Sequence, residues 1–411
     1  MPERYKKLID ATVDQYGGGF DPETGLATIE LMKAEIGEEE TTKRMQESAR
    51  RIVKVMMDVD LFENPYSDRA AAKEILESEA AYAFGLESSE KSIVMLKNKG
   101  NVISSAGLGD KPKVYIPQHL VSPGFMSSFD PYFELAIDEE VANELFDVVT
   151  DEVGEPTGKS STTMGFGMAD AVDEDKPPVY QQSDAVLPTD KLKECAYAIL
   201  RIKSPTDAHD GVGGAGITGM GMAEGEIEYL PMTLQYRPYT ADDARDPSIG
   251  GFIVDGVKEN RSYKGKTTNA SNESDLDKVI EVRNALPEDA KLIVIIDAGK
   301  PMVFSELEPY CDVILLSYTM QSTATGAAYA NIISGKVEPS AVLPFQQPID
   351  MHTVEANYED VPRDMDCYVD SEGNAYDFCF GLNWSGVIDD ERTATYKVNP
   401  LTEPETEVVW G

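Results

Sequence analysis

The fold is decided by residues 292–335, which read LIVIIDAGKPMVFSELEPYCDVILLSYTMQSTATGAAYANIISG. Two runs rich in branched apolar residues, Leu292–Ile296 and Val313–Tyr318, have the length and composition of strands buried on both faces. A helical segment follows each run, Val303–Leu307 after the first and Ala324–Ser334 after the second. Strands that alternate with crossover helices form a parallel sheet covered on both faces. The stretch therefore predicts an α/β fold.

The same alternation continues toward the N-terminus. Further strands and a capped helix are expected at Ser92–Leu96, Lys113–Pro117, Tyr197–Ile202 and, for the helix, from Ser271 or Asn272 through Leu286. Two segments without a sustained period, 146–185 and 203–271, predict long loops. Residues 90–388 are thus predicted to form one domain, a mainly parallel sheet sandwiched by helices, with a C-terminal tail at 389–411.

The N-terminal part of the chain has a helical pattern. Residues 1–66 contain an apolar stripe, from Met45 to Met56, that recurs at helical spacing and needs a surface to cover it. A further helix, Arg69–Leu86, is expected within a linker at 67–89. These segments place a helical region ahead of the α/β domain.

Charge and composition exclude several classes of function. The formal net charge of −38 would repel a phosphate backbone, so no nucleic-acid partner is expected. No apolar run reaches the length of a membrane span, and the first residues lack the apolar core of a signal peptide, so the expected location is cytoplasmic. The four cysteines and three histidines show no metal-ligand spacing, and neither a metal nor another cofactor is expected.

Four stretches, in a fixed order, carry a family resemblance. They read RRIVKVMMDVDLFENPY (50–66), EKSIVMLKNKGNVI (90–103), GKPMVFSELEPYCDVILLSYTMQSTATGAAYANIISGKVEPSAVLPFQQP (299–348) and YDFCFGLNWSGVI (376–388). Together they resemble glycoside hydrolase family 3, of the β-glucosidase type. The resemblance implies that the first stretch closes the family's (β/α)8 catalytic barrel and that the other three belong to its C-terminal α/β sandwich. Residues 1–66 would then be a remnant of the last β/α unit of the barrel.

The chain departs from the family where the catalytic nucleophile is expected. Neither the family's SDW-type motif, which carries the nucleophilic Asp, nor its sugar-binding KH motif occurs in the sequence. The resemblance thus implies the C-terminal portion of a retaining β-glycosidase that hydrolyses terminal β-linked sugars. Its carbohydrate substrate would be bound together with a barrel on a separate chain or on another copy in a homo-oligomer. The lone chain is expected to be inactive.

The resemblance implies that this part of the family supplies the acid/base, for which Glu259 is the first candidate. The family's acid/base Glu lies on a loop ahead of a helix start, and aligning that start with residues 272–276 places Glu259 close to the expected position. Glu224, Glu226 and Glu228 are rival candidates on the same long loop. A retaining glycosidase needs such a group together with a nucleophile about 5–5.5 Å away.

Side chains around Glu259 provide candidate sugar contacts. Guanidinium and phenol groups could bind sugar hydroxyls, and aromatic rings could stack on a pyranose face; the candidates are Arg237, Tyr239, Arg261 and Tyr263, with Tyr229 and Tyr236 as further stacking residues. The alternative is that Glu259 is a solvated loop carboxylate paired with Arg261 or Lys264, and that the aromatic side chains serve local packing.

Other interpretations of the long loop are weaker. The stretch GAGITG (214–219) matches the dinucleotide pattern GxGxxG, but the residues after it do not form a convincing helix, so a loop is favoured. His209 lies between Asp207 and Asp210, where a solvated turn is favoured over a metal or acid/base cluster. The alternative function for the whole chain is a non-catalytic carbohydrate-binding or scaffold protein with the same fold.

Overall fold

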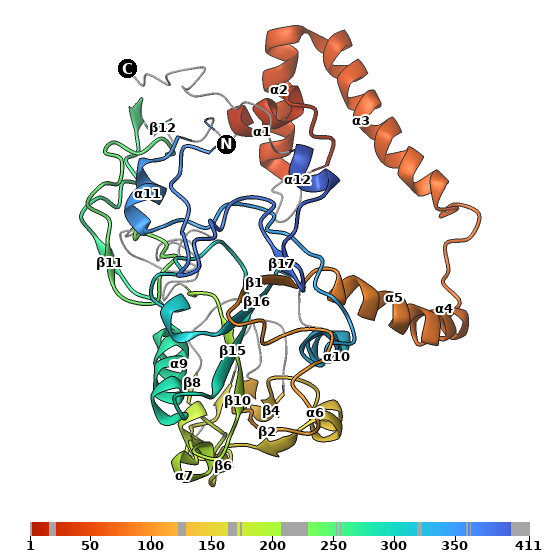
Figure 1. The fold of residues 1–411 in the computed structure, drawn as a ribbon. Coiled ribbons are helices and arrows are strands. Elements are labelled where there is room, and N and C mark those ends of the chain that lie inside the picture. Colours follow the sequence, from red (N-terminus) through yellow and green to blue (C-terminus); the bar gives the residue numbers. More distant parts are fainter. Residues whose placement is uncertain are drawn as a thin grey trace. The chain divides into compact units, whose positions relative to one another are not determined.

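The computed structural model of the 411-residue chain divides into two compact units, Met1–Ala81 and Tyr82–Gly411 (Figure 1). The structure describes residues 2–15, 22–121, 129–162, 171–172, 175–206, 229–251, 253–254, 256–318, 323–358, 361 and 363–395. Within these residues, every helix is too short or too polar to cross a membrane.

Helices build the described part of the first unit. They are α1 (Pro2–Asp10), α2 (Pro22–Ile36), α3 (Glu38–Asp58) and α4 (Arg69–Leu76). Gly37 separates α2 from α3 with a φ of +86°, a region that side chains disfavour. Three glutamates in the first turn of α3 complement the positive end of its dipole. The described residues of 1–66 are therefore mainly helical, as predicted, and their origin as a barrel remnant stays a prediction.

Asp14 fastens the segment after α1 to α3. Its carboxylate accepts a hydrogen bond of 2.7 Å from Ser48 and lies 3.0 Å from the Arg44 guanidinium and 3.1 Å from that of Arg51. The Ser48 hydroxyl, helped by the two arginines, lowers the pKa of Asp14 to about 2. This cluster links the segment after α1 to α3 by polar contacts.

The second unit is built on an eight-stranded sheet with the strand order β18-β17-β1-β16-β15-β10-β2-β5. Its strands are β1 (Val94–Asn98), β2 (Lys113–Tyr115), β5 (Asp147–Val149), β10 (Tyr197–Lys203), β15 (Lys291–Asp297), β16 (Val313–Ser317), β17 (Leu382–Asn383) and β18 (Gly386–Val387). The five strands from β16 to β5 are parallel, whereas β1, β17 and β18 pair antiparallel. The predicted, mainly parallel sheet is confirmed.

The strand order reverses between β2 and β10. From β2 the chain moves outward to β5, returns past β2 to β10, and continues through β15 to β16. In open sheets such a reversal leaves a crevice beyond the carboxyl ends of the two inner strands. Residues at the carboxyl ends of β2 and β10 therefore border this crevice.

Helices cover both faces of the sheet. In Figure 1, α9 (Glu273–Ala285) lies on one face, and α10 (Thr323–Ile333) and α6 (Glu139–Leu145) lie on the other. The predicted limits of α9 and α10 hold within a residue or two. Gly335 follows α10 with a φ of +73°, and a Cβ there would lie 2.2 Å from the carbonyl oxygen of Ser104. A glycine is thus required where α10 ends against its neighbour.

The predicted helix at Val303–Leu307 is wrong. This segment ends in a turn that leads into a short 3-10 helix, η2 (Glu308–Tyr310). Pro309 lies in the first turn of η2, and too few residues remain before β16 for an α-helix to form. The segment 146–185, expected to be a loop, contains β5, whose Val148 pairs in parallel with β2.

The linker holds two helices instead of the single one expected over Arg69–Leu86. A break at residues 77–78 separates α4 from α5 (Glu79–Glu90). The Ser78 hydroxyl accepts a hydrogen bond of 3.1 Å from the backbone N–H of Ala81, which begins the second helix independently of the first. Helical periodicity continues through this break, so the sequence pattern does not reveal it.

Candidate functional site

Glu259 follows a short hairpin in the second unit. The hairpin consists of β12 (Ile253–Val254) and β13 (Val257–Lys258), which pair antiparallel. Gly251 precedes it with a φ of +139°, and a Cβ at Gly251 would lie 2.1 Å from the Glu259 carbonyl oxygen. The close approach of the two backbones, which only glycine allows, fixes the position from which the Glu259 side chain projects.

Both carboxylate oxygens of Glu259 have hydrogen-bond donors. The Tyr229 hydroxyl donates to one oxygen at 2.7 Å, and Nε of Arg261 donates to the other at 2.8 Å. The Arg261 guanidinium also lies 5.5 Å from the centre of the Tyr229 ring, in a cation–π arrangement. Burial, and then the bond to Glu259, raise the pKa of Tyr229. Glu259 is thus paired with Arg261, as expected under the alternative that it is a loop carboxylate in an ion pair.

Arg237 is directed to α9. Its guanidinium nitrogens lie 2.8 Å from Glu273 and 2.6 Å from Asp277, and these two carboxylates, Asp277 first, raise its pKa. The backbone N–H groups of Tyr236 and Arg237 donate to Glu306. Arg237 therefore anchors its loop to the first turns of α9, and it is not among the residues that line the pocket described next.

Tyr239 and Tyr263 converge on a carboxylate that the sequence did not single out. Glu355 lies on α11 (Met351–Ala356) and accepts hydrogen bonds from the Tyr239 hydroxyl at 3.2 Å and the Tyr263 hydroxyl at 3.4 Å. Burial raises the pKa of Glu355 against the opposing effect of the two phenols. Glu355 is 92 residues from Tyr263 and 116 from Tyr239, so no spacing in the sequence reveals the contact.

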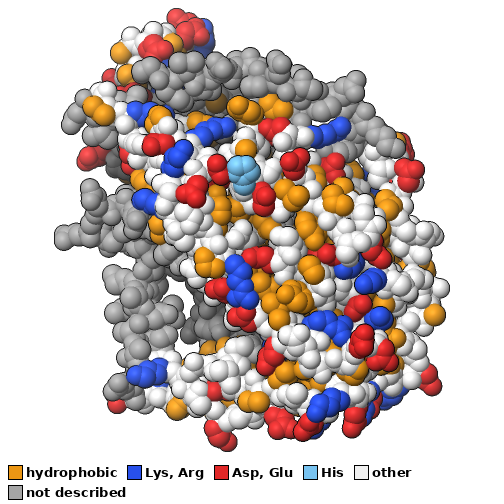
Figure 2. Space-filling model, turned by 60° about the vertical axis from the view of Figure 1, so that its left-hand side comes forward, with side chains coloured by type: hydrophobic (Ala, Val, Ile, Leu, Met, Phe, Trp, Pro, Cys, Tyr) orange, Lys and Arg blue, Asp and Glu red, His pale blue; other side chains and the backbone are white. Residues whose placement is uncertain are grey.

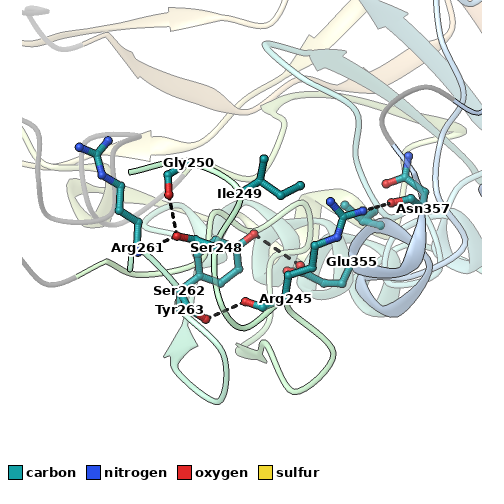
Figure 3. A pocket seen from close by; sticks show the side chains of 10 residues that line it. Arg245, Ser248, Ile249, Gly250, Arg261, Ser262, Tyr263, Glu355 and Asn357 are labelled. Atoms are coloured by element: carbon teal, nitrogen blue, oxygen red, sulfur yellow. Dashed lines mark hydrogen bonds between the residues drawn. The ribbon is translucent and has the colours of Figure 1, made fainter. Parts of the chain in front are cut away.

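Tyr263 and Glu355 border a pocket of about 330 Å³ (Figure 3). Its lining consists of Arg245, Ser248, Ile249, Gly250, Arg261, Ser262, Tyr263, Val354, Glu355 and Asn357. The Arg245 guanidinium donates to the Asn357 carbonyl at 3.3 Å, and the Ser262 hydroxyl donates to the Arg245 carbonyl at 2.7 Å. Arg261 contributes its backbone N–H, which donates to Ser248, while its guanidinium points away from Tyr263 and Glu355.

The pocket combines a cation, a carboxyl group, hydroxyls and an aromatic ring. Such a lining suits a hydroxylated ligand, since Arg245 donates hydrogen bonds, Glu355 can accept them, and Tyr263 offers an edge or face. Among the described residues that line it, Glu355 alone carries a carboxyl group. Of the predicted contacts, Arg261 and Tyr263 line the pocket directly, and Tyr239 reaches it only through Glu355.

Figure 2 shows acidic, basic and hydrophobic side chains interspersed on one face of the molecule. In the described part of the chain, no group of three or more His, Cys, Asp or Glu side chains is arranged to hold a metal ion. Glu224, Glu226, Glu228, His209 and the GAGITG stretch (214–219) lie outside the described residues.

Comparison with known proteins identifies the family of this region. Residues 253–384 match the sequence model of the glycosyl hydrolase family 3 C-terminal domain. The chain is 21% identical over 383 residues to probable β-glucosidase C of Aspergillus oryzae, and the match covers 93% of this chain and 41% of that protein. β-Glucosidase C of Emericella nidulans is 21% identical over 376 residues, with 92% and 42% covered. The chain thus spans about two fifths of the length of these relatives.

Among solved structures, the fold is similar to a β-glucosidase from Listeria innocua in complex with glucose. The TM-score is 0.48 at 16% sequence identity, and the match covers 93% of this chain and 44% of that chain. The matched segment 253–384 begins at the β12–β13 hairpin and includes Glu259, Arg261, Tyr263 and Glu355. Within this chain, residues 253–384 carry the glycosyl hydrolase family 3 C-terminal domain.

Proposed function

We propose that the chain works as the C-terminal portion of a retaining β-glycosidase of the β-glucosidase type, which hydrolyses terminal β-linked sugars. One observation carries the proposal: the family-matched segment contains two carboxyl groups, Glu259 and Glu355, set beside a pocket suited to a hydroxylated ligand. The relatives from Aspergillus and Emericella are named as β-glucosidases, which supports the same class of substrate.

The nucleophile of this reaction is proposed to come from a (β/α)8 barrel outside these 411 residues. Retention of configuration needs a second carboxylate about 5–5.5 Å from the acid/base. Glu355 is the only carboxyl group among the described lining residues of the pocket, and the sequence has no SDW motif. We therefore propose that the lone chain is inactive and that a separate barrel chain, or another copy in a homo-oligomer, completes the site.

The exposed apolar side chains of the first unit support the proposal that a further protein element packs against them. Val55, Met57 and Phe62 are 63%, 60% and 59% exposed, and Val53 and Met56 of the predicted stripe are also exposed. An apolar helix face of this kind is normally packed against a neighbouring element. A catalytic barrel that includes this region would supply that neighbour.

Two carboxyl groups are candidates for the acid/base. The resemblance favours Glu259, whose two oxygens are bound by Tyr229 and Arg261. The geometry adds Glu355, which lines the pocket and whose raised pKa favours the protonated form that a general acid needs. The pairing of Glu259 with Arg261 also fits a positioning role, in which the ion pair orients the loop.

The test begins with the assembled enzyme. The chain is co-expressed with a candidate barrel chain, such as one encoded beside its gene, and hydrolysis of 4-nitrophenyl β-D-glucopyranoside is measured for the complex and for the chain alone. We expect turnover by the complex and none by the chain alone. Turnover by the pure lone chain would refute the missing nucleophile. Binding of glucose or cellobiose by the complex without any turnover would favour the alternative, a non-catalytic carbohydrate-binding protein.

Glu→Gln variants then identify the acid/base. Replacing the true acid/base should slow hydrolysis of cellobiose by about 10²–10⁴-fold. It should slow 4-nitrophenyl glucoside cleavage less, because this leaving group needs little protonation, and added azide should restore turnover. E259Q and E355Q are compared with E288Q, a matched change at an exposed residue that does not line the pocket. If a variant loses activity toward both substrates equally and azide does not restore turnover, the replaced residue is a positioning residue.

A further inference from the structure

A second pocket, of about 440 Å³, lies where the strand order reverses between β2 and β10. It shares no lining residue with the pocket around Glu355. Gln118 and His119 border it at the start of β3 (Gln118–Val121), Leu200–Ile202 border it from β10, and residues 274–281 border it from α9. Open α/β sheets bind small molecules in the crevice at this reversal.

Four neutral polar side chains of the lining, Gln118, His119, Ser183 and Ser274, have no hydrogen bond to any described residue. Burial, with nearby cations, lowers the pKa of His119 to about 4, so its ring is neutral near pH 7. A neutral imidazole offers one donor and one acceptor, an amide offers both, and each hydroxyl offers both. The unused hydrogen-bonding capacity of the pocket is therefore mixed in kind and uncharged.

The charged groups around the pocket already have partners. The Nε of Arg201 donates to Asp297 at 2.8 Å, and the Lys278 ammonium lies 3.6 Å from Asp151. Asp275 accepts a hydrogen bond of 3.1 Å from the backbone N–H of Lys203, among others. With its nearest cations neutralised in this way, the pocket gains little from binding an anion.

The rest of the lining disfavours binding of an anionic ligand and favours contact with apolar parts of a ligand. Asp277, which is paired with Arg237, and Glu281 line the pocket from α9, so a phosphate group would lie near the Glu281 carboxylate. Apolar surface in the lining comes from Pro117, Ala136 and Leu200. Free neutral donors and acceptors beside apolar carbons match a molecule that carries several hydroxyls on a carbon ring.

We propose that this pocket binds a neutral polyhydroxylated molecule of monosaccharide size, at a site separate from the one that contains Glu355. Its volume falls within the range of small-molecule sites, about 300–1,000 Å³. The proposal does not depend on the hydrolytic function, because no residue of the catalytic proposal lines this pocket. A chain without glycosidase activity would still bind its ligand here.

Histidine NMR tests the proposal residue by residue. The chain has three histidines, so the full chain labelled with ¹³C at histidine Cε1 gives few signals, and the variant His119→Gln assigns that of His119. D-Glucose and myo-inositol are titrated, with inorganic phosphate as the anionic comparison. We expect a saturable shift of the His119 signal at concentrations on the order of millimolar with at least one of the two polyols. The signal of His352, an exposed residue 2.6 Å from Asp243, should stay in place.

Variants separate this site from the pocket around Glu355. Ser274 lies at an exposed helix position, where a substitution should not affect folding. Ser274→Val is expected to weaken binding of the polyol by about threefold to tenfold. Glu355→Gln should leave the His119 titration unchanged. The proposal is overturned if neither polyol shifts the His119 signal saturably, if phosphate does so at lower concentration, or if Glu355→Gln weakens binding as much as Ser274→Val does.

Discussion

Lys97 forms an ion pair in the interior of the second unit, and breaking it should be among the most destabilising single changes in the chain. Lys97 lies on β1 within SIVMLKN, and both it and Glu308 of η2 are about 2% exposed or less. The ammonium contacts the Glu308 carboxylate and donates to the Glu308 carbonyl at 3.1 Å. Tyr368 and Ser371 donate to the same carboxylate at 3.0 and 2.7 Å.

Lys97→Met removes the cation and leaves a buried carboxylate with neutral donors only. Removing one partner of a buried pair costs about 3–5 kcal/mol of unfolding free energy. At a urea m-value of about 3 kcal/mol/M, the unfolding midpoint should fall by about 1–1.7 M. Burial acts to raise the pKa of Glu308, but the hydrogen bonds from Lys97 and Ser371 lower it overall. The stabilisation is therefore present above the unfolded pKa and is lost as pH falls through the folded one.

Urea unfolding followed by circular dichroism measures the effect. Lys97→Met combined with Glu308→Gln should recover more than half of the loss, because the amide keeps an acceptor for Tyr368 and carries no charge. Lys193→Met is the matched control, since Lys193 is 65% exposed in its pair with Asp190 and should cost about 1 kcal/mol or less. A loss below about 1 kcal/mol for Lys97→Met, or a double variant as unstable as the single one, would refute the reasoning.

Gly335→Ala should destabilise the second unit by about 2 kcal/mol or more, because a side chain is disfavoured at a φ of +73° and its Cβ would lie 2.2 Å from the Ser104 oxygen; urea unfolding that shows no loss would contradict this. The raised pKa of Glu355 means that its folded form favours the proton, so the associated stability is present below the unfolded pKa and is lost as pH rises through the folded one. The stability of Glu355→Gln should accordingly be closest to that of the wild type near pH 4 and should rise relative to it toward pH 8. A stability difference that does not change with pH would count against an effect of partial burial on this carboxyl group. Asp14, whose pKa is lowered to about 2, has the opposite sign: its contribution is present above the unfolded pKa and is lost as pH falls. Asp14→Asn should thus increase amide hydrogen exchange in α3 around Ser48 at pH 7 and have little effect near pH 2; equal exchange at pH 7 would exclude this link.

The sheet could be predicted from the sequence because its strands are short, nearly continuous apolar runs. Ile293 to Ile296 and Val313 to Leu316 are fully buried, as strands covered by helices on both faces must be. The failure at Val303–Leu307 has a local cause, since apolar residues there fill the core from a turn instead of from a helix. Apolar content alone does not distinguish these two conformations over so few residues.

The candidate site was predictable only where its contacts are local. Glu259 and Arg261 are two positions apart, and their pairing, the alternative that the sequence suggested, is what the structure contains. Arg237 looked like a ligand contact because it lies on the same long loop, but two acidic side chains of α9 bind it instead. A loop arginine in a chain with a net charge of −38 meets carboxylates in many directions, so its partner depends on the tertiary fold.

Glu355 shows why the remainder of the site needed the structure. The residue belongs to a six-residue helix that starts at a capping Asp350, and nothing in its neighbourhood distinguishes it from other glutamates of an acidic chain. Its character comes from burial and from two phenols that the fold brings from about a hundred residues away. Since those phenols hold the carboxyl group at the pocket wall, Tyr239 can act on a ligand through Glu355, and Tyr263 can act both through Glu355 and directly. The sequence singled out the two tyrosines but not the carboxyl group that both contact, because only the folded chain brings that group to them.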